Sequence, residues 1–395
     1  MRILCLIGGS QTEARTLVPV IRALASKGAD VRVLVTQHLF RDGRFLAVLD
    51  ILKREGIEFS VPGFVTGLSV DKWLNKIMPT GIVAANDCLV LNRLFLIRAQ
   101  QEGIPFFLVE EAPSASLLGP VNNTIRDFRW LARNFSSALF IISTLVCNRQ
   151  WRELISRLLK TITHQSLNNR GYGFGPVDIS FVFSEFDRSY LRSNGALAKE
   201  IVVSGLPGIP IHKCKSMRAD RLYDCLMLSA GEGQFLMSRD EQIQLFTEIV
   251  TALKVRNPNA KILFKPHPLE DPEVIRQLGG MVDISTNLED AFDQAKVAIG
   301  TVTTSLFQAL LAGLPILVYS PDRHQWPDLF ILRECREQGM LARDEKELAR
   351  LLDDEAHLLE SSTSLKNRWS SVLDQAATTI ASRVMDRCQS SQVDV

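Results

Sequence analysis

The chain has 395 residues, 46% of them hydrophobic, and its 45 Lys and Arg residues against 44 Asp and Glu residues leave a formal net charge of +1 at pH 7. A chain of this length can bury more than one core and usually folds into two domains. The balanced charge gives no sign of a nucleic-acid surface, so we expect no nucleic acid among its partners. Seven cysteines without a CxxC pair or a metal-ligand spacing are typical of reduced thiols, which favours a cytoplasmic protein.

In the first half of the chain, apolar runs alternate with segments of helical periodicity. Residues 2–7 form a first strand rather than a signal peptide, because the apolar run is short and ends in glycines instead of a cleavage site. The other elements predicted in this half are helices over 12–26, 45–55 and 91–101, and strands over 30–36, 82–85, 105–110, 179–184 and 200–204. Such alternation predicts a parallel sheet with helices on both faces and with ligands at the carboxyl ends of its strands.

The segment Gly205–Pro210 is rich in glycine and proline, which end regular structure, and it predicts a linker. A second alternation follows, with strands over 224–229, 261–264, 282–284, 297–299 and 316–319 and helices over 239–255, 288–294 and 304–311. We therefore predict an α/β protein of two doubly wound, Rossmann-like domains that face each other across a cleft. The first is an acceptor-side domain over residues 1–210 with an insertion at about 122–170. The second is a nucleotide-binding domain over 211–395, whose C-terminal helix can pack back on the first.

A predicted strand ends in Lys265-Pro266-His267-Pro268. Each proline fixes its own φ, and Pro268 also keeps His267 out of the helical region, so a stiff loop presents the imidazole and the Lys265 ammonium. A second strand runs into a helix at Gly300–Ser305, where hydroxyl groups lie beside free backbone N–H groups. An imidazole, hydroxyl groups and the N-terminal amides of a helix can hold a phosphate without a metal. The two segments predict an anion site at the ends of successive strands.

These motifs allow a family resemblance to be stated. The two-domain layout, the segment Phe264–Pro268, and Gly300–Ser305 leading into Ala309–Pro315 resemble the GT-B glycosyltransferases. Within that group the chain is most similar to surface-polysaccharide enzymes that carry an HP motif: bacterial sialyltransferases and polysialyltransferases, capsular Kdo transferases and CDP-glycerol glycerophosphotransferases of teichoic acid synthesis. The resemblance covers roughly residues 223 to 320 well and the first half of the chain less closely.

Two adjacent carboxylates, Glu110 and Glu111, end the predicted strand over 105–110. In sialyltransferases of the HP-motif group, a D/E-D/E-G motif at a similar place supplies the general base that deprotonates the acceptor hydroxyl, and Glu110-Glu111-Ala112 resembles it, with alanine in place of glycine. Burial and a like-charged neighbour can raise a carboxylate pKa into the range that suits a base. Since adjacent strand residues point to opposite faces, we expect only one of the two in the cleft, and the sequence leaves open which.

Two glycine-rich turns supply further candidate contacts. Gly8, Gly9 and Ser10 follow the first strand and are placed to line the acceptor side of the cleft. The turn that includes Gly231, Glu232 and Gly233 follows the first strand of the second domain, where backbone amides can approach a donor phosphate. This turn lacks the third glycine of a dinucleotide fingerprint, and the chain has no GxxxxGK[ST] loop, so neither NAD binding nor P-loop ATP hydrolysis is indicated.

The segment from residue 126 to 160 has seven basic residues and two acidic ones, and it contains an apolar run over 137–147 between Trp130 and Trp151. The run is too short to span a bilayer. Basic and tryptophan flanks suit a segment that lies on an anionic membrane surface, where a lipid-linked acceptor would be found. A buried helical pair that caps the first domain explains the same pattern, so both interpretations stay open.

The sequence thus predicts a metal-independent glycosyltransferase of capsule, lipopolysaccharide or related polysaccharide synthesis, cytoplasmic or peripheral on the inner face of the membrane. The expected donor-site residues are Lys265, His267, Pro268, Gly231, Glu232, Gly233, Thr303, Thr304 and Ser305. We expect Glu110 or Glu111 to activate the hydroxyl of a glycan or lipid-linked acceptor, and a protonated His267 to stabilise the leaving phosphate. No Asp-x-Asp motif is present and no cofactor is expected beyond the nucleotide-activated sugar as co-substrate.

The HP resemblance favours a CMP-activated sugar, sialic acid or Kdo, as the donor. CDP-glycerol and UDP-sugars are the alternatives for a transferase. A UDP-sugar 2-epimerase has the same two-domain architecture, but it requires further acid and base groups that the sequence does not place. A non-catalytic scaffold with an altered Glu110-Glu111-Ala112 motif is the remaining alternative.

Overall fold

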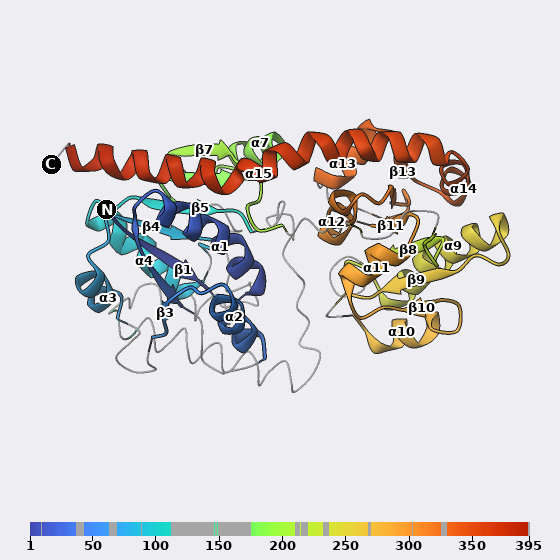
Figure 1. Cartoon of the computed structure of the whole chain (residues 1–395), viewed down its shortest axis with the longest axis horizontal. Coiled ribbons are helices and arrows are strands. Elements are labelled where there is room, and N and C mark those ends of the chain that lie inside the picture. Colours follow the sequence, from blue (N-terminus) through green and yellow to red (C-terminus); the bar gives the residue numbers. More distant parts are fainter. Residues whose placement is uncertain are drawn as a thin grey trace. The chain divides into compact units, whose positions relative to one another are not determined.

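A computed structural model of the protein (Figure 1) divides into two compact units. Unit 1 comprises Met1–Ile209 and Val372–Val395, and unit 2 comprises Pro210–Ser371. The structure describes residues 1–8, 10–36, 43–62, 69–87, 89–111, 146, 148, 175–209, 214, 220–231, 237–267, 270–301, 303–324 and 330–393. Each unit is a parallel sheet with alternating helices, so the predicted α/β fold class is confirmed.

Unit 1 contains a parallel sheet of seven strands in the order β3-β2-β1-β4-β5-β6-β7. Its strands are β1 (Arg2–Ile7), β2 (Asp30–Val35), β3 (Phe59–Ser60), β4 (Gly81–Ala84), β5 (Phe106–Val109), β6 (Ile179–Val182) and β7 (Glu200–Val203). The central strands β1, β4, β5 and β6 are almost fully buried, as expected for a parallel sheet with both faces covered. The chain starts in the middle of the sheet and adds strands on both sides.

Helices cover both faces of this sheet (Figure 1). They are α1 (Gln11–Ser26), α2 (Gly43–Arg54), α3 (Val70–Ile77), α4 (Val90–Gln101) and α7 (Glu185–Ser193). Alternate residues of β1 point to opposite faces: Cys5 lies in a core cluster with α1 and α2, and Leu4 lies in a second cluster with α3 and α4. The sheet therefore stands between two hydrophobic cores, which leaves its carboxyl edge as the place where loops and polar side chains gather.

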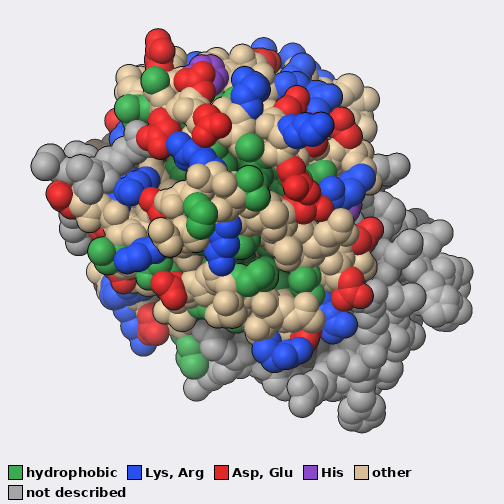
Figure 2. Space-filling model, turned by 90° about the vertical axis from the view of Figure 1, so that its right-hand side faces the viewer, with side chains coloured by type: hydrophobic (Ala, Val, Ile, Leu, Met, Phe, Trp, Pro, Cys, Tyr) green, Lys and Arg blue, Asp and Glu red, His purple; other side chains and the backbone are tan. Residues whose placement is uncertain are grey.

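Unit 2 contains a parallel sheet of six strands in the order β10-β9-β8-β11-β12-β13. Its strands are β8 (Cys225–Leu228), β9 (Ile262–Lys265), β10 (Asp283–Ile284), β11 (Ala298–Gly300), β12 (Ile316–Tyr319) and β13 (Leu341–Ala342). The helices are α9 (Arg239–Arg256), α10 (Pro272–Leu278), α11 (Leu288–Gln294), α12 (Thr304–Ala312), α13 (Phe330–Glu337) and α14 (Glu345–Asp353). On the face of the molecule in Figure 2, acidic and basic side chains of the described residues are interspersed.

The last helix, α15 (Glu355–Val393), contributes residues to both units. In unit 2, Trp369 packs edge-on against Phe330, with ring centroids 4.6 Å apart. In unit 1, Ile380, Val384 and Cys388 lie in the core cluster that also holds α1 and α2. The helix is thus buried in a different core at each of its ends.

The insertion predicted at about 122–170 lies outside the described residues, apart from Val146 and Asn148. Asn148 accepts a hydrogen bond at 2.9 Å from the backbone N–H of Val70, the first residue of α3. Among the described helices, none has both the length and the apolar character that a membrane span requires. The membrane contact of residues 126–160 stays a prediction.

Candidate functional site

Each sheet has a point where its strand order reverses. In unit 1 the chain proceeds from β1 to β2 on one side and later to β4 on the other, and in unit 2 β8 is flanked in the same way by β9 and β11. Loops that leave neighbouring strands in opposite directions open a crevice at the carboxyl edge, which is where open α/β sheets bind ligands. The residues that follow β1, β4 and β5 and those that follow β8, β9 and β11 are therefore the candidate sites.

In unit 2, strand register brings the predicted donor segments together. Leu228 at the end of β8 pairs with Lys265 of β9 on one side and with Gly300 of β11 on the other. Further along the chain from these paired residues, Gly231 lies against the imidazole of His267. A Cβ added at Gly231 would lie 3.0 Å from Nδ1 and 3.2 Å from Cγ. Gly231 has a φ of +71°, in the left-handed region that favours glycine.

A buried polar network holds the turn after β8. The hydroxyl of Ser229 donates to the carboxylate of Glu270 and accepts from the backbone N–H of Gly231 at 2.9 Å. The amide of Gln242 on α9 donates to Glu270 at 3.1 Å and to the Ser229 hydroxyl at 3.3 Å. Glu270 in turn donates its backbone N–H to the carbonyl of His267 at 2.9 Å. One carboxylate thus ties the loop after β9 to the turn after β8, which fixes His267 relative to Gly231.

The side chains of His267 and Lys265 are half-buried basic groups of this edge. Burial lowers the pKa of both side chains, and for His267 the nearby Glu270 carboxylate acts in the opposite direction. The Lys265 ammonium donates to the carbonyl of Pro266 at 2.9 Å. The sequence analysis expects a protonated His267, but burial favours the neutral imidazole at neutral pH in the ligand-free protein. A neutral imidazole still has one N–H to donate, and a bound phosphate would favour the protonated form.

The predicted hydroxyl cluster lies at the N-terminus of α12. Thr303 is the buried N-cap, and its Oγ1 accepts from the backbone N–H of Ser305 at 3.2 Å. Thr304 is exposed and Ser305 is half-buried. Thr301, between β11 and the cap, is fully buried. The exposed end of this cluster is therefore Thr304, and the Thr303 hydroxyl is already used by the helix cap.

In unit 1, the two adjacent carboxylates at the end of β5 have different surroundings. Glu110 is 5% exposed, and its Oε2 accepts from the backbone N–H of Phe183 at 2.7 Å, just beyond β6. Glu111 is partly exposed, and its Oε2 is buried without a hydrogen-bond partner in the described structure. Burial raises the pKa of Glu111 to about 7, and a hydrogen bond from the Asn86 side chain acts in the opposite direction. Glu110 thus links the ends of β5 and β6 by a hydrogen bond, whereas Glu111 has one carboxylate oxygen without a hydrogen bond in the described structure.

A third carboxyl group, which the sequence analysis did not single out, belongs to the same edge. Glu13 in the first turn of α1 is 2% exposed and accepts a hydrogen bond from the backbone N–H of Gly8. Burial raises the pKa of Glu13 to about 8, and repulsion by Glu111 adds to this. A Cβ at Gly8 would clash with Leu89 and with the Glu13 carboxylate. The amide of Gly8 is thus occupied by Glu13, and Ser10 caps α1 by accepting from Thr12 at 3.1 Å.

Several predicted positions cannot be placed. Gly9, Ala112, Glu232, Gly233 and Pro268 lie outside the described residues. Asn86, at the end of β4, is a further polar residue of this edge that the sequence analysis missed. The sequence pattern could have identified Asn86, since Asn86 and Asp87 directly follow the apolar run that contains β4. A polar pair directly after a central strand marks the carboxyl edge.

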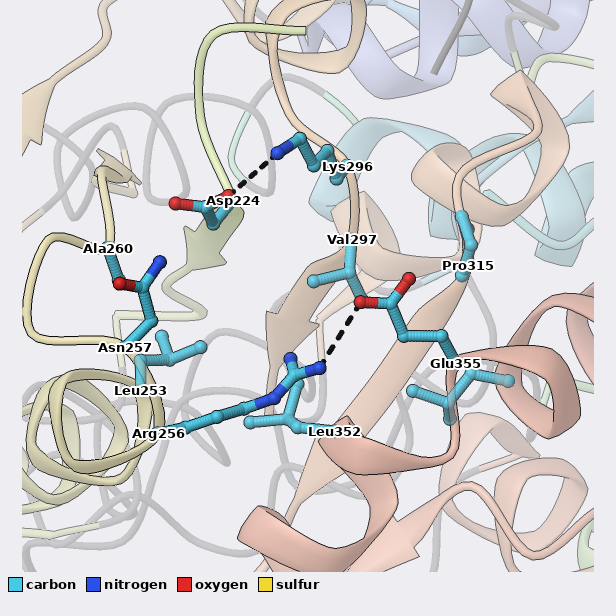
Figure 3. A pocket seen from close by; sticks show the side chains of 11 residues that line it. Asp224, Leu253, Arg256, Asn257, Ala260, Lys296, Val297, Pro315, Leu352 and Glu355 are labelled. Carbon is cyan, nitrogen blue, oxygen red and sulfur yellow. Dashed lines mark hydrogen bonds and ion pairs between the residues drawn. The ribbon is translucent and has the colours of Figure 1, made fainter. Parts of the chain in front are cut away.

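A cavity of about 320 Å³ lies at the opposite, amino edge of the unit 2 sheet (Figure 3). Its charged side chains pair with each other: Lys296 contacts Asp224 at 2.8 Å, and Arg256 contacts Glu355 at 3.3 Å. Asp224 precedes β8 and Val297 precedes β11, so the cavity is separated from His267 by the length of the strands. It does not coincide with the predicted donor site.

The chain matches no protein-family model and no curated protein by sequence. Among solved structures, it is similar over 98% of its length to 98% of the glycotransferase of kitacinnamycin, with a TM-score of 0.57 and 14% identity. The UDP-GlcNAc 2-epimerase from Neisseria meningitidis bound to UDP-GlcNAc gives a TM-score of 0.56 and 12% identity over 98% of this chain and 99% of that chain. The glycosyltransferase VinC in complex with dTDP gives 0.53 and 11% over 98% of this chain and 100% of that chain.

At this level of identity the likeness shows the fold. The chain has the α/β architecture of two Rossmann-like domains found in GT-B glycosyltransferases and in UDP-GlcNAc 2-epimerases. The narrower resemblance to the HP-motif group is not confirmed by these structures. Glycosyltransferases and epimerases are both among the neighbours, so the fold does not choose between these two activities.

Proposed function

We propose that the protein is a nucleotide-sugar-dependent glycosyltransferase. In this proposal, unit 2 binds the nucleoside diphosphate or nucleoside monophosphate of the donor at the ends of β8, β9 and β11. Unit 1 provides the general base for the acceptor hydroxyl. The observation that supports the proposal is the strand register in which Leu228 pairs with both Gly300 and Lys265. The segments that follow these three paired residues contain Thr304, Gly231 and His267, and they leave the sheet at one switch point.

The donor site gains its anion affinity from several partial charges. His267 donates an imidazole N–H, Thr304 donates a hydroxyl, and the N-terminus of α12 adds its dipole. As the bond between sugar and phosphate breaks, the electron pair leaves with the phosphate and its negative charge grows. Preorganised donors stabilise that charge more than the charge of the intact donor, which is the condition for catalysis.

Glu111 is the proposed general base. Its spare Oε2 can take the proton of the acceptor hydroxyl as the hydroxyl oxygen attacks the anomeric carbon. Burial favours a raised pKa, so the carboxylate binds a proton more readily than an exposed glutamate does. Glu110 is an unsuitable base because a backbone N–H of the neighbouring strand already occupies its Oε2.

The identity of the donor is a further part of the proposal. Solved neighbours hold UDP-GlcNAc, UDP-2-fluoroglucose or dTDP, and these structures lend no support to the CMP-linked sialic acid or Kdo favoured by the HP motif. A UDP-sugar, one of the alternatives from the sequence, is therefore the first donor to test. CDP-glycerol and the CMP-linked sugars follow.

A thermal-shift panel of UDP, dTDP, CDP, CMP and GDP tests the donor site, because a ligand that binds the folded state raises its apparent stability. Transfer is then assayed with the sugar donors of the nucleotide that binds. A nucleotide that binds without transfer or hydrolysis of any of its sugar donors would favour a non-catalytic scaffold. Stabilisation by no nucleotide would contradict the proposal.

A UDP-sugar 2-epimerase is the second candidate, and one observation favours it. The sequence placed no further acid or base group, but Glu13, a buried carboxyl group that accepts from the backbone N–H of Gly8 after β1, belongs to the same edge of the sheet as Glu111. Two carboxyl groups with different protonation states can supply both a base and an acid. Incubation with UDP-GlcNAc alone separates the candidates, since an epimerase forms product without an acceptor and a transferase does not.

A further inference from the structure

Glu13 is a buried carboxyl group that has no counter-ion among the residues that the structure describes. In the described part of the chain it takes part in no ion pair, and the hydrogen bond from Gly8 is its contact with the end of β1. A Cβ at Gly8 would lie 2.6 and 2.9 Å from the two carboxylate oxygens, so a larger residue at position 8 would displace the carboxyl group. Burying an unpaired carboxylate is costly, and the usual escape is to bind a proton.

Glu111 increases the free-energy cost of ionising Glu13, because a second negative charge repels the first. Gly8, which donates to Glu13, follows β1, and Glu111 follows β5; only β4 separates these two strands, so both carboxyl groups belong to the same carboxyl edge of the sheet. Burial raises the pKa of Glu13 to about 8, and the charge of Glu111 acts in the same direction. The Asn86 side chain donates a hydrogen bond to Glu111, which stabilises the ionised carboxylate and so lowers the pKa of Glu111 against the effect of burial. The two carboxyl groups therefore have unequal surroundings. Glu13 is the more deeply buried, and Glu111 is the one with a side-chain donor.

The other described acidic groups at this edge are already occupied. Asp87, after β4, accepts from the backbone N–H of Gly175 at 2.7 Å, and Glu110 accepts from Phe183. Thr36, after β2, donates its hydroxyl to the neutral side chain of Asn92 at 2.7 Å. No basic side chain among the described residues forms an ion pair with Glu13 or Glu111. With the groups that the structure describes at this edge, proton binding is thus the way to relieve the repulsion between the two carboxyl groups.

We propose that Glu13 is a positioning residue of the unit 1 site, which keeps its proton while Glu111 is ionised, so that the pair carries a single negative charge at neutral pH. This inference rests on the proposed function in taking Glu111 as the base. During transfer, the proton of the acceptor hydroxyl goes to Glu111, the acceptor oxygen bonds to the anomeric carbon, and the electron pair of the broken bond leaves with the nucleotide phosphate. Glu13 keeps its proton throughout, and Glu111 returns its own to water.

The test needs no substrate. The full-length protein is labelled with carbon-13 at the glutamate carboxyl carbon and titrated by NMR, and the variants Glu13→Gln and Glu111→Gln each remove one resonance and so assign the pair. We expect both carboxyl groups to titrate well above the ordinary glutamate pKa of about 4.3. In Glu111→Gln, the Glu13 resonance should titrate lower by about one unit or more, because the repulsion is gone. The exposed Glu102→Gln variant is the control and should shift neither resonance.

Two results would overturn the inference: ordinary titration of both groups, or a Glu13 resonance that Glu111→Gln leaves unmoved. If Glu13→Gln does not fold, Glu111→Gln alone decides. Because the titration is independent of turnover, a coupled pair in a protein that transfers no sugar rejects the proposed function alone. Uncoupled groups in an active transferase reject this inference alone. In an active enzyme, Glu13→Gln should also keep the acid limb of the pH profile and lose the alkaline limb, whereas a merely structural role would lower the rate equally at every pH.

Discussion

Gly231 and His267 are in contact across the ends of two neighbouring strands, and the contact exists because residue 231 has no side chain: a Cβ there would lie 3.0 Å from the imidazole Nδ1. The glycine is also in the left-handed region, with a φ of +71°. Backbone conformation and close packing thus both require glycine at this turn, and both act on the residue that we propose as the phosphate ligand.

The Gly231→Ala variant should therefore weaken nucleotide binding as well as stability. A left-handed conformation costs an alanine about 1 to 2 kcal/mol, and the new methyl group must also displace the imidazole. Gly56→Ala is the matched control, because Gly56 has a φ of +68° and nothing within 4 Å of an added Cβ. Isothermal titration should show weaker nucleotide binding in Gly231→Ala alone, and Gly231→Ala should lose at least as much unfolding free energy as Gly56→Ala. Equal nucleotide affinity in the two variants would place the phosphate elsewhere.

The His267→Ala variant should lose about 2 to 4 kcal/mol of transition-state stabilisation, the range measured for single donors to a developing negative charge. The loss should appear in kcat/KM for the donor with the fold intact, because His267 is a half-buried loop residue. His357→Ala, on α15, removes an imidazole at another place in unit 2 and serves as the control. A double change of Thr304 and Ser305 to Ala should be non-additive with His267→Ala if all act on one phosphate. Parental turnover in a folded His267→Ala protein contradicts the donor site.

The fold class could be predicted because the strands that carry it are apolar runs bounded by turn residues. Predicted and observed bounds agree within two residues for β1, β4, β8 and β12. The short strands β3 and β13 were not predicted, because a segment of two residues has little periodicity to recognise, whereas the equally short β10 was predicted as residues 282–284. Helix α15 was also not delimited. It is buried in one core near Trp369 and in another near Val384, so a single apolar stripe does not run along it.

The donor segments of the candidate site could be predicted because the prolines beside His267 and the hydroxyl groups after Gly300 are local signals. Glu13 could not be predicted, since a glutamate in the first turn of a helix is ordinarily an exposed residue that interacts with the helix dipole. Its carboxyl group turns back to the end of β1, where the backbone N–H of Gly8 donates to it, and Leu89, distant in sequence, lies against the same glycine. The choice between Glu110 and Glu111 likewise depended on a neighbour distant in sequence, the backbone N–H of Phe183.

The membrane prediction is tested by sedimentation with lipid vesicles. If residues 126–160 lie on an anionic surface, the protein should sediment with vesicles that contain phosphatidylserine and be released as salt rises, because surface attraction is screened over about 8 to 10 Å near physiological ionic strength. The Arg149→Ser, Arg152→Ser double variant should bind more weakly. Sedimentation that depends neither on lipid charge nor on these arginines would favour the alternative of a buried helical pair.

Stability should fall as pH rises from weakly acidic to neutral and slightly alkaline conditions. The folded-state pKa values are about 8 for Glu13 and about 7 for Glu111, above the ordinary value in an unfolded chain of about 4.3. The folded state therefore binds these protons more tightly, and the stability that they contribute is full below the unfolded value and lost as pH rises through the folded ones. Urea unfolding should show a decline of roughly 2 kcal/mol or more between about pH 5 and 8, since one unit corresponds to about 1.4 kcal/mol. The double variant Glu13→Gln, Glu111→Gln should lose this decline, and a wild-type curve parallel to that of the variant would contradict the assignment.

The last prediction separates the two adjacent glutamates at the end of β5. Glu111→Gln should cut turnover by roughly 10² to 10⁴-fold with little change in donor affinity, because the amide keeps the shape of the side chain but cannot take the proton of the acceptor. Glu110→Gln should instead affect the structure. A Gln carbonyl oxygen can still accept from the Phe183 N–H, so kcat should change little and the unfolding free energy should fall by about 1 kcal/mol.

Wild-type activity should also decrease as pH falls through the Glu111 pKa of about 7, and Glu110→Gln should retain that acid limb. Kinetics of both variants across pH, with donor affinity measured separately by titration, give the answer. Equal and modest losses in the two variants with an unaltered pH profile would assign both carboxylates to structure and would direct the search for the base to other residues of unit 1.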